Sequence, residues 1–206
     1  VHLYTASGAL AAFFGTLAVF AGDYRQALLW MFGATVVDAT DGWLARRVRV
    51  KEKLPGFDGA RLDDIVDYLT FVFLPALFLH ESGALPAGWS AGIASVVLLS
   101  SAYGFARDDA KTSDHFFSGF PSYWNIVALY LHIAALPPAW NAVIVLVLCI
   151  LVFWRVGYVY PSRTPVLRAM TLVLAVVWSV VVVAMILALP RVLPEPGGLE
   201  TGATRL

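Results

Sequence analysis

Long apolar stretches separated by short polar segments dominate the pattern of this chain. Several of these stretches approach the roughly 20 residues that a helix needs to cross the core of a bilayer. We predict helices over residues 4–22, 26–46, 61–80, 89–106, 121–136, 139–158 and 166–189. Because backbone amides in lipid need partners within their own segment, the pattern predicts an all-α fold, a polytopic transmembrane helix bundle of six to seven spanning helices.

The composition supports a membrane protein and argues against a soluble one. Hydrophobic residues make up 60% of the chain and charged residues only 14%. Residues 1–190 are predicted to form a single membrane-embedded domain, since no linker divides them. Residues 191–206 are rich in proline and glycine and are predicted to be a flexible tail. The formal net charge is zero, and nothing in the charge pattern suggests a nucleic-acid partner.

The basic residues gather in alternate connections between the predicted helices, and this asymmetry predicts an orientation. The connections after the second, fourth and sixth helices, together with the helix ends beside them, hold 11 of the 14 lysines and arginines. These are Arg46, Arg47, Arg49, Lys51, Lys53, Arg61, Arg107, Lys111, Arg155, Arg163 and Arg168. Positively charged connections stay in the cytoplasm, so this end of the bundle is predicted to face it.

Four aspartates near that end stand out, because a carboxylate at membrane depth costs roughly 3 kcal/mol on insertion scales. Asp38 and Asp41 are spaced i, i+3, and Asp63 and Asp67 are spaced i, i+4, so each pair shares one helix face. Two helices joined by a short loop can direct all four carboxylates at one point. Hard divalent cations such as Mg²⁺ or Mn²⁺ prefer oxygen ligands, so we predict a site for two metal ions.

A simpler interpretation is that these acids only pair with the nearby arginines at the membrane interface. That interpretation does not require the small residues Gly42, Ala45 and Gly59, which lie beside the aspartates. Small residues let a backbone or a bulky ligand come close, as glycine does where phosphates approach a chain.

Read together, these residues resemble the signature of the CDP-alcohol phosphotransferase family. Residues 38–46 read DATDGWLAR, and after twelve residues 59–67 read GARLDDIVD, so that all eight fixed positions of the signature match. The spacer is longer than in most of the family and resembles the bacterial phosphatidylcholine synthase branch. Residues 1–8, 57–76 and 120–125 resemble that branch too. Many family members carry a Pro-Asn pair near the start of the first helix, where this chain has Thr5 and Ser7.

The resemblance implies transfer of a phosphatidyl group from CDP-diacylglycerol to choline, with release of CMP, in the bacterial inner (cytoplasmic) membrane. It implies two Mn²⁺ or Mg²⁺ ions, an active site that faces the cytoplasm, contact with membrane lipid, and an assembly compatible with a homodimer. The implied metal ligands are Asp38, Asp41, Asp63 and Asp67, and Asp67 would also be the general base. The implied donor contacts are Arg46 to a phosphate oxygen, and Gly42, Ala45 and Gly59 as room for the cytidine and diphosphate.

Choline is a quaternary ammonium ion, so its pocket should offer aromatic faces. Tyr123 and Trp124 are the leading candidates, because Pro121 and Asn125 make their segment unlike an ordinary lipid-facing helix start. The alternative is that both belong to an aromatic belt at the membrane interface.

Three other functions remain open at this point. The same reaction could use serine, inositol phosphate or glycerol phosphate as the acceptor, and a phosphorylated acceptor would need further arginines or lysines at the site. An intramembrane prenyltransferase also binds a diphosphate through aspartates and Mg²⁺, but its chemistry does not require the glycines and Arg46. A cation-coupled transporter also uses buried carboxylates, and it predicts uptake into vesicles without release of CMP.

Overall fold

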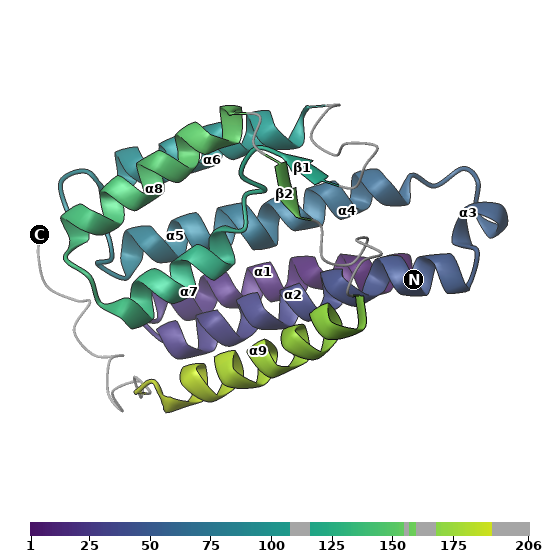
Figure 1. The fold of residues 1–206 in the computed structure, drawn as a ribbon, viewed down its shortest axis with the longest axis horizontal. Helices are drawn as coiled ribbons and strands as arrows, with labels where there is room; N and C mark the ends of the chain where they lie inside the picture. Colours follow the sequence, from purple (N-terminus) through teal and green to yellow (C-terminus); the bar gives the residue numbers. More distant parts are fainter. Residues whose placement is uncertain (108–115, 155–156, 160–167, 191–206) are drawn as a thin grey trace, which may run out of the picture.

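The computed structural model of the chain describes residues 1–107, 116–154, 157–159 and 168–190 (Figure 1). Within these residues the regular structure is helical apart from two three-residue strands, so the all-α class is confirmed. The elements are α1 (His2–Phe20), α2 (Tyr24–Arg47), α3 (Val50–Lys53), α4 (Gly59–Asp67), the π-helix η1 (Tyr68–Phe73), α5 (Leu74–Glu81), α6 (Ser90–Phe105), β1 (Phe116–Ser118), α7 (Trp124–Ala134), α8 (Pro138–Phe153), β2 (Gly157–Val159) and α9 (Arg168–Ala188). The predicted tail 191–206 lies outside the described residues, as do Lys111, Arg155 and Arg163.

Each of the seven predicted helices coincides with helical structure. The third, predicted over 61–80, is a continuous run from Gly59 to Glu81 that changes from α4 to the π-helix η1 and back to α5. The sixth, predicted over 139–158, ends earlier, at Phe153, because Trp154 is extended and the chain continues into β2. The strand β2 pairs antiparallel with β1, and neither strand was expected from the sequence.

Two of the described helices, His2–Phe20 and Ala169–Ala188, are long and apolar enough to cross a membrane. The helices Ser90–Phe105, Trp124–Ala134 and Pro138–Phe153 are apolar but shorter. Two helices therefore meet the length and hydropathy that spanning requires, and the bundle of six to seven spanning helices remains a prediction.

The helices form an elongated bundle in which successive long elements run in opposite directions (Figure 1). Gly22, at φ +72°, and Asp23 reverse the chain between α1 and α2, and the Asp23 carboxylate caps α2 by accepting a hydrogen bond from the Gln26 N–H at 2.9 Å. The C-terminal ends of α2 and α6 and the N-terminal ends of α1 and α4 consequently lie toward the same end of the bundle (Figure 1). That end holds the residues of the signature.

The distribution of apolar side chains divides the bundle into a packed interior and an apolar exterior. Trp124, Phe78, Leu28 and Val97 are among the fully buried side chains. Large apolar side chains are also exposed along several helices, most densely on α9. The large apolar residues exposed on α9 are Met170, Leu172, Val173, Leu174, Val176, Val177, Val180, Val181 and Leu187. An apolar outer surface of this extent is unusual for a soluble monomer.

Two glycines let α1 lie directly on the helical run from Gly59 to Glu81. A Cβ atom at Gly8 would lie 2.5 Å from Cγ1 of Val66, and a Cβ at Gly15 would lie 2.5 Å from Cδ2 of Leu74. Both distances are shorter than carbon atoms tolerate, so only glycine fits at these positions without a shift. Because α1 also packs along α2, it joins the two helices that carry the aspartates.

Candidate active site

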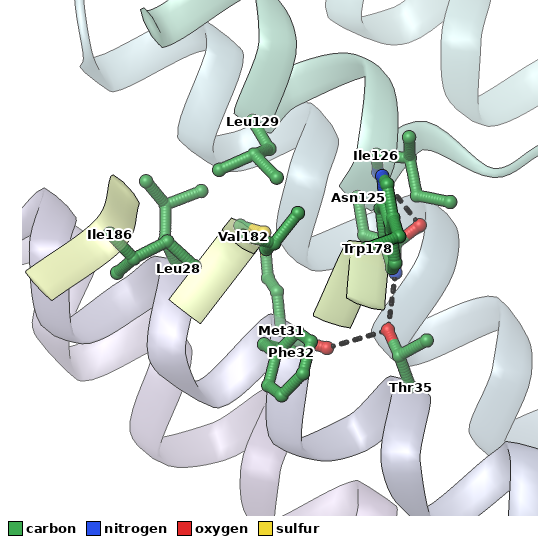
Figure 2. Close-up of a pocket in the computed structure, with 10 residues that line it drawn as sticks. All are labelled: Leu28, Met31, Phe32, Thr35, Asn125, Ile126, Leu129, Trp178, Val182 and Ile186. Carbon is green, nitrogen blue, oxygen red and sulfur yellow. Dashed lines mark hydrogen bonds between the residues drawn. The ribbon is translucent and has the colours of Figure 1, made fainter. Parts of the chain in front are cut away.

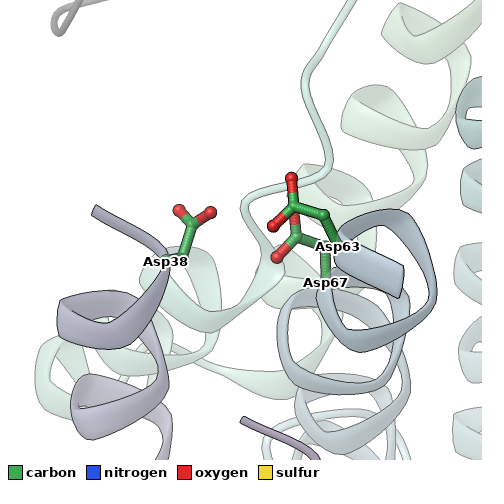
Figure 3. Close-up of side chains that lie close together, drawn as sticks. All are labelled: Asp38, Asp63 and Asp67. Atoms are coloured by element: carbon green, nitrogen blue, oxygen red, sulfur yellow. The ribbon is translucent and has the colours of Figure 1, made fainter. Parts of the chain in front are cut away.

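Three of the four predicted aspartates form one cluster at the basic end of the bundle. Asp38 comes from α2, and Asp63 and Asp67 come from α4, with one ligand atom of each carboxylate lying within 4.8 Å of the others. All three are partly buried, and Figure 3 shows their carboxylates extending to the same side of the two helices. Oxygen atoms at this spacing suit a divalent metal ion, so the residues present fit the cation that the signature implies.

Local helix geometry places this cluster. Asp63 and Asp67 are one turn apart on α4, so their side chains lie on the same face. The helix begins after Asp58, whose carboxylate caps it by accepting a hydrogen bond from the Arg61 N–H at 3.0 Å. The Arg61 side chain lies 3.9 Å from the same carboxylate, and both side chains are largely exposed. Asp58 therefore starts the helix that carries the two aspartates.

The fourth aspartate, Asp41, is held by α1 and is not part of the three-carboxylate cluster. It is only 6% exposed, and its Oδ2 accepts a hydrogen bond of 2.7 Å from the hydroxyl of Thr5, which is equally buried. One residue earlier on each helix, the hydroxyls of Tyr4 and Thr40 lie 2.7 Å apart. These two contacts form a polar seam between α1 and α2 beside the cluster.

The small residues and the arginine of the signature lie at the ends of α2 and α4. A Cβ atom at Gly42 would lie 3.3 Å from a guanidinium nitrogen of Arg46, so the glycine leaves room for that side chain to lie back along α2. Arg46 is exposed and Ala45 is partly buried. At Gly59 a Cβ atom would lie 2.8 Å from Cε1 of His2, so an imidazole already lies against this glycine.

The two aromatic candidates for choline binding have different surroundings. Trp124 is fully buried, its indole N–H donates a hydrogen bond of 2.8 Å to the hydroxyl of Ser101, and its ring packs edge-on against Phe120. Its ring therefore offers no accessible face to a ligand in this structure. Tyr123 is partly buried, with its ring centroid 5.9 Å from that of Phe71 in η1.

A mainly apolar crevice between α2, α7 and α9 begins one turn from Asp38 (Figure 2). Its polar residues are Thr35 and Asn125, and the Asn125 amide donates a hydrogen bond of 2.8 Å to the Thr35 hydroxyl. That hydroxyl in turn donates to the carbonyl oxygen of Met31 at 3.0 Å. The hydrogen bond between Asn125 and Thr35 joins α7 to α2. Since Thr35 precedes Asp38 by three residues, this contact lies one helical turn from the cluster.

Sequence reasoning missed three residues of the first helix that contact the signature. His2 lies against Gly59, Thr5 binds Asp41, and Tyr4 binds Thr40. The sequence held a weak signal, because His2 and Thr5 are three residues apart and Gly8 follows after three more. This spacing marks a small or polar stripe on an otherwise apolar helix.

Comparison with known proteins identifies relatives over most of the chain. No protein-family model matches. A phosphatidylcholine synthase of Legionella pneumophila is 48% identical over 165 residues, which cover 79% of this chain and 64% of that protein. A phosphatidylcholine synthase of Pseudomonas aeruginosa is 38% identical over 204 residues, 99% of this chain and 86% of that protein. The phosphatidylcholine synthase of Borreliella burgdorferi is 33% identical over 90% of the chain and 80% of its own length. With its carboxylate cluster and these relatives, the chain belongs to the phosphatidylcholine synthase family.

Proposed function

We propose that this chain transfers the phosphatidyl group of CDP-diacylglycerol to the hydroxyl of choline, forming phosphatidylcholine and releasing CMP. The observation that carries the proposal is the cluster of Asp38, Asp63 and Asp67, which lies within the matched signature of a chain whose relatives are named phosphatidylcholine synthases. Like charges this close repel one another unless a cation or a proton lies between them, so three carboxylates within 4.8 Å of one another support a metal site.

The proposed cofactor is a pair of Mn²⁺ or Mg²⁺ ions held by Asp38, Asp41, Asp63 and Asp67. When bound, such ions stabilise the charge that develops on the attacking and leaving oxygens during displacement at phosphorus. The three-carboxylate cluster supports this assignment, and Asp41 lies one helical turn from Asp38 on α2.

Asp67 is the proposed general base. The hydroxyl of choline is a poor nucleophile at neutral pH, so a carboxylate within hydrogen-bond reach must accept its proton. As that proton moves to Asp67, the choline oxygen bonds to the phosphorus that carries the diacylglycerol. The bond from this phosphorus to the bridging oxygen breaks, and that oxygen leaves with CMP.

The remaining signature residues are assigned to the donor. Arg46, with its fixed positive charge, is proposed to hold a phosphate oxygen. Gly42 and Ala45 are proposed to leave room beside the diphosphate. Gly59 is likewise proposed to leave room for the donor at the start of α4, where the imidazole of His2 lies against it.

For the acceptor we retain Tyr123 as the proposed aromatic contact to the quaternary ammonium group of choline. Its partial burial beside η1 supports this choice, because a cation held against a ring gains most when it is partly removed from water. Trp124 was an equal candidate in the sequence, but its complete burial favours a packing role.

We further propose that the protein spans the bacterial inner membrane several times, with the aspartates at the cytoplasmic side. The exposed apolar side chains of α9 and the two helices of sufficient length support a membrane location. At about 1.5 Å per residue, α2 and the run from Gly59 to Glu81 are also long enough to cross a core of about 30 Å. The diacyl chains of the donor can then stay in the bilayer while its diphosphate reaches the carboxylates.

The reaction is tested with purified protein in lipid nanodiscs, CDP-diacylglycerol, Mn²⁺ or Mg²⁺, and labelled choline, serine, inositol phosphate and glycerol phosphate offered separately. We expect labelled lipid with choline alone, formed in equal amount with CMP. Chelation with EDTA should abolish the reaction and added Mn²⁺ or Mg²⁺ should restore it. Turnover of another alcohol in place of choline would overturn the assignment of choline as the acceptor. Cation uptake into vesicles without CMP release would overturn the assignment of the protein as an enzyme.

The role of Asp67 is tested with a matched pair of variants. Asp67→Asn removes the base and should lower the rate by about 10²–10⁴-fold. Asp64→Asn makes the same chemical change at an exposed residue outside the signature positions and should leave the rate near that of the wild type. Full activity of the Asp67→Asn protein would remove the base assignment.

A further inference from the structure

Asp41 is a buried carboxylate in contact with a neutral hydrogen-bond donor. Its side chain is 6% exposed, and Thr5 Oγ1 donates a hydrogen bond of 2.7 Å to Oδ2. Among the residues that the structure describes, no lysine, arginine or histidine forms an ion pair with it. Buried charges in proteins are paired with a cation or coordinate a metal, because an isolated buried anion is very costly.

The hydroxyl of Thr5 satisfies only part of the hydrogen-bonding capacity of the Asp41 carboxylate. A carboxylate has two oxygens and about four lone-pair sites, and Thr5 occupies one of them. The bond restrains the carboxylate at Oδ2 and leaves Oδ1 for a second, positively charged partner. Asp41 lies one helical turn from Asp38, so a cation bound at the cluster of Asp38, Asp63 and Asp67 is a candidate for that partner.

We infer that Thr5 is a positioning residue for the metal site, and that it orients Asp41 as a ligand from the neighbouring helix α1. This inference rests on the proposed function, since it assumes that the carboxylates bind divalent metal. Groups that hydrogen-bond to a ligating carboxylate fix its orientation, and their removal typically lowers metal affinity about 10- to 100-fold. It gives a function to a polar residue in the apolar first helix.

The position of Thr5 is set by the packing of α1 and not by a flexible loop. Gly8, one turn further along, lies against Val66 of α4, and Tyr4 contacts Thr40 of α2. The threonine is thus held between the two helices that carry the aspartates. A hydroxyl on a rigid helix, itself 6% exposed, has little freedom to leave its partner.

The test measures Mn²⁺ binding to the detergent-purified full chain without lipid substrate, by electron paramagnetic resonance of the free ion. Thr5→Val keeps the shape of the side chain and removes the donor, and we expect its dissociation constant for Mn²⁺ to rise about 10- to 100-fold. Thr5→Ser keeps the hydroxyl and should stay near the wild type. Tyr4→Phe removes the neighbouring α1–α2 contact, which involves no aspartate, and should also stay near the wild type.

The outcomes separate this inference from the proposed function. If Thr5→Val binds Mn²⁺ as the wild type does, or if Tyr4→Phe weakens binding equally, the positioning role is overturned while CMP release by the wild type still stands. If Thr5→Val does not fold, Thr5→Ala and Thr5→Ser give the same comparison, and equal affinities for Mn²⁺ in these two variants overturn the inference. A wild type that binds Mn²⁺ but releases no CMP from CDP-diacylglycerol refutes the transfer reaction alone.

Discussion

Gly8 lets the first helix lie directly on the helix that carries Asp63 and Asp67, and Gly8→Ala tests what that contact does. The added methyl group would lie 2.5 Å from Cγ1 of Val66. Carbon atoms pack at about 3.5–4.0 Å, so the contact is too short by about 1–1.5 Å. Val66 is 6% exposed and β-branched, so its side chain has almost no alternative rotamer and the two helices must separate.

The magnitudes predict a larger effect on activity than on stability. Overpacking typically costs about 1–3 kcal/mol, while alanine stabilises a helix interior by about 1 kcal/mol relative to glycine. The net destabilisation is therefore about 0–2 kcal/mol, which leaves most of the protein folded. Val66 directly precedes Asp67, so the displacement reaches the carboxylates, and a misplacement of about 1 Å can lower the rate about 10²-fold.

The assay compares CMP release with the thermal midpoint for Gly8→Ala, the double variant Gly8→Ala/Val66→Ala and the control Gly92→Ala. Gly92 is an exposed glycine of α6, and a Cβ atom there would meet no atom outside its own helical turn within 4 Å, so its substitution should leave the rate unchanged and raise the thermal midpoint only by the gain in helix propensity. Removing the Val66 methyl groups should restore part of the lost activity. Wild-type rates in Gly8→Ala, or no recovery in the double variant, would refute the idea that this contact sets the position of the aspartates.

Two further predictions concern the acceptor pocket and the membrane orientation. Tyr123→Ala should raise the apparent KM for choline with little change in the thermal midpoint, and an unchanged KM would exclude that residue from the pocket. Trp124→Ala should instead destabilise the protein by about 3–5 kcal/mol, because the ring is fully buried. In a variant whose buried Cys149 is replaced by alanine, a cysteine at Glu52 should react with impermeant maleimide only in inside-out vesicles, and one at Gly83 only in right-side-out vesicles. The reverse pattern would place the aspartates on the opposite side of the membrane.

The positions of the helices were predictable because apolar runs and polar breaks alternate clearly along the chain. The three-carboxylate cluster was predictable too, since helix periodicity alone places Asp63 and Asp67 on one face. Asp38 joined them as expected from a short connection between two antiparallel helices. The prediction for these residues needed only helix periodicity and the antiparallel pairing of two helices that follow each other in the sequence.

Other features depend on contacts between distant segments, which local patterns do not encode. The bond from Thr5 to Asp41 joins residues 36 positions apart. His2, near the start of the chain, lies against Gly59 in the second half of the signature. Tyr123 and Trp124 are neighbours in sequence with the same interfacial character, yet only Trp124 is fully buried. The buried indole of Trp124 has a hydrogen-bond partner inside the bundle, the hydroxyl of Ser101.

The π-helix η1 lets α4, which carries Asp63 and Asp67, and α5, which packs in the core, differ in their rotation about the helix axis. It begins at Tyr68, directly after Asp67, and ends where Leu74 enters the interior. Its wider turns accommodate extra chain, so α4 and α5 need not share one helical phase. Deleting one residue here would rotate one half against the other by about 100°. An insertion or deletion in this short segment would thus rotate Asp63 and Asp67 away from Asp38, although every residue of the signature remained unchanged.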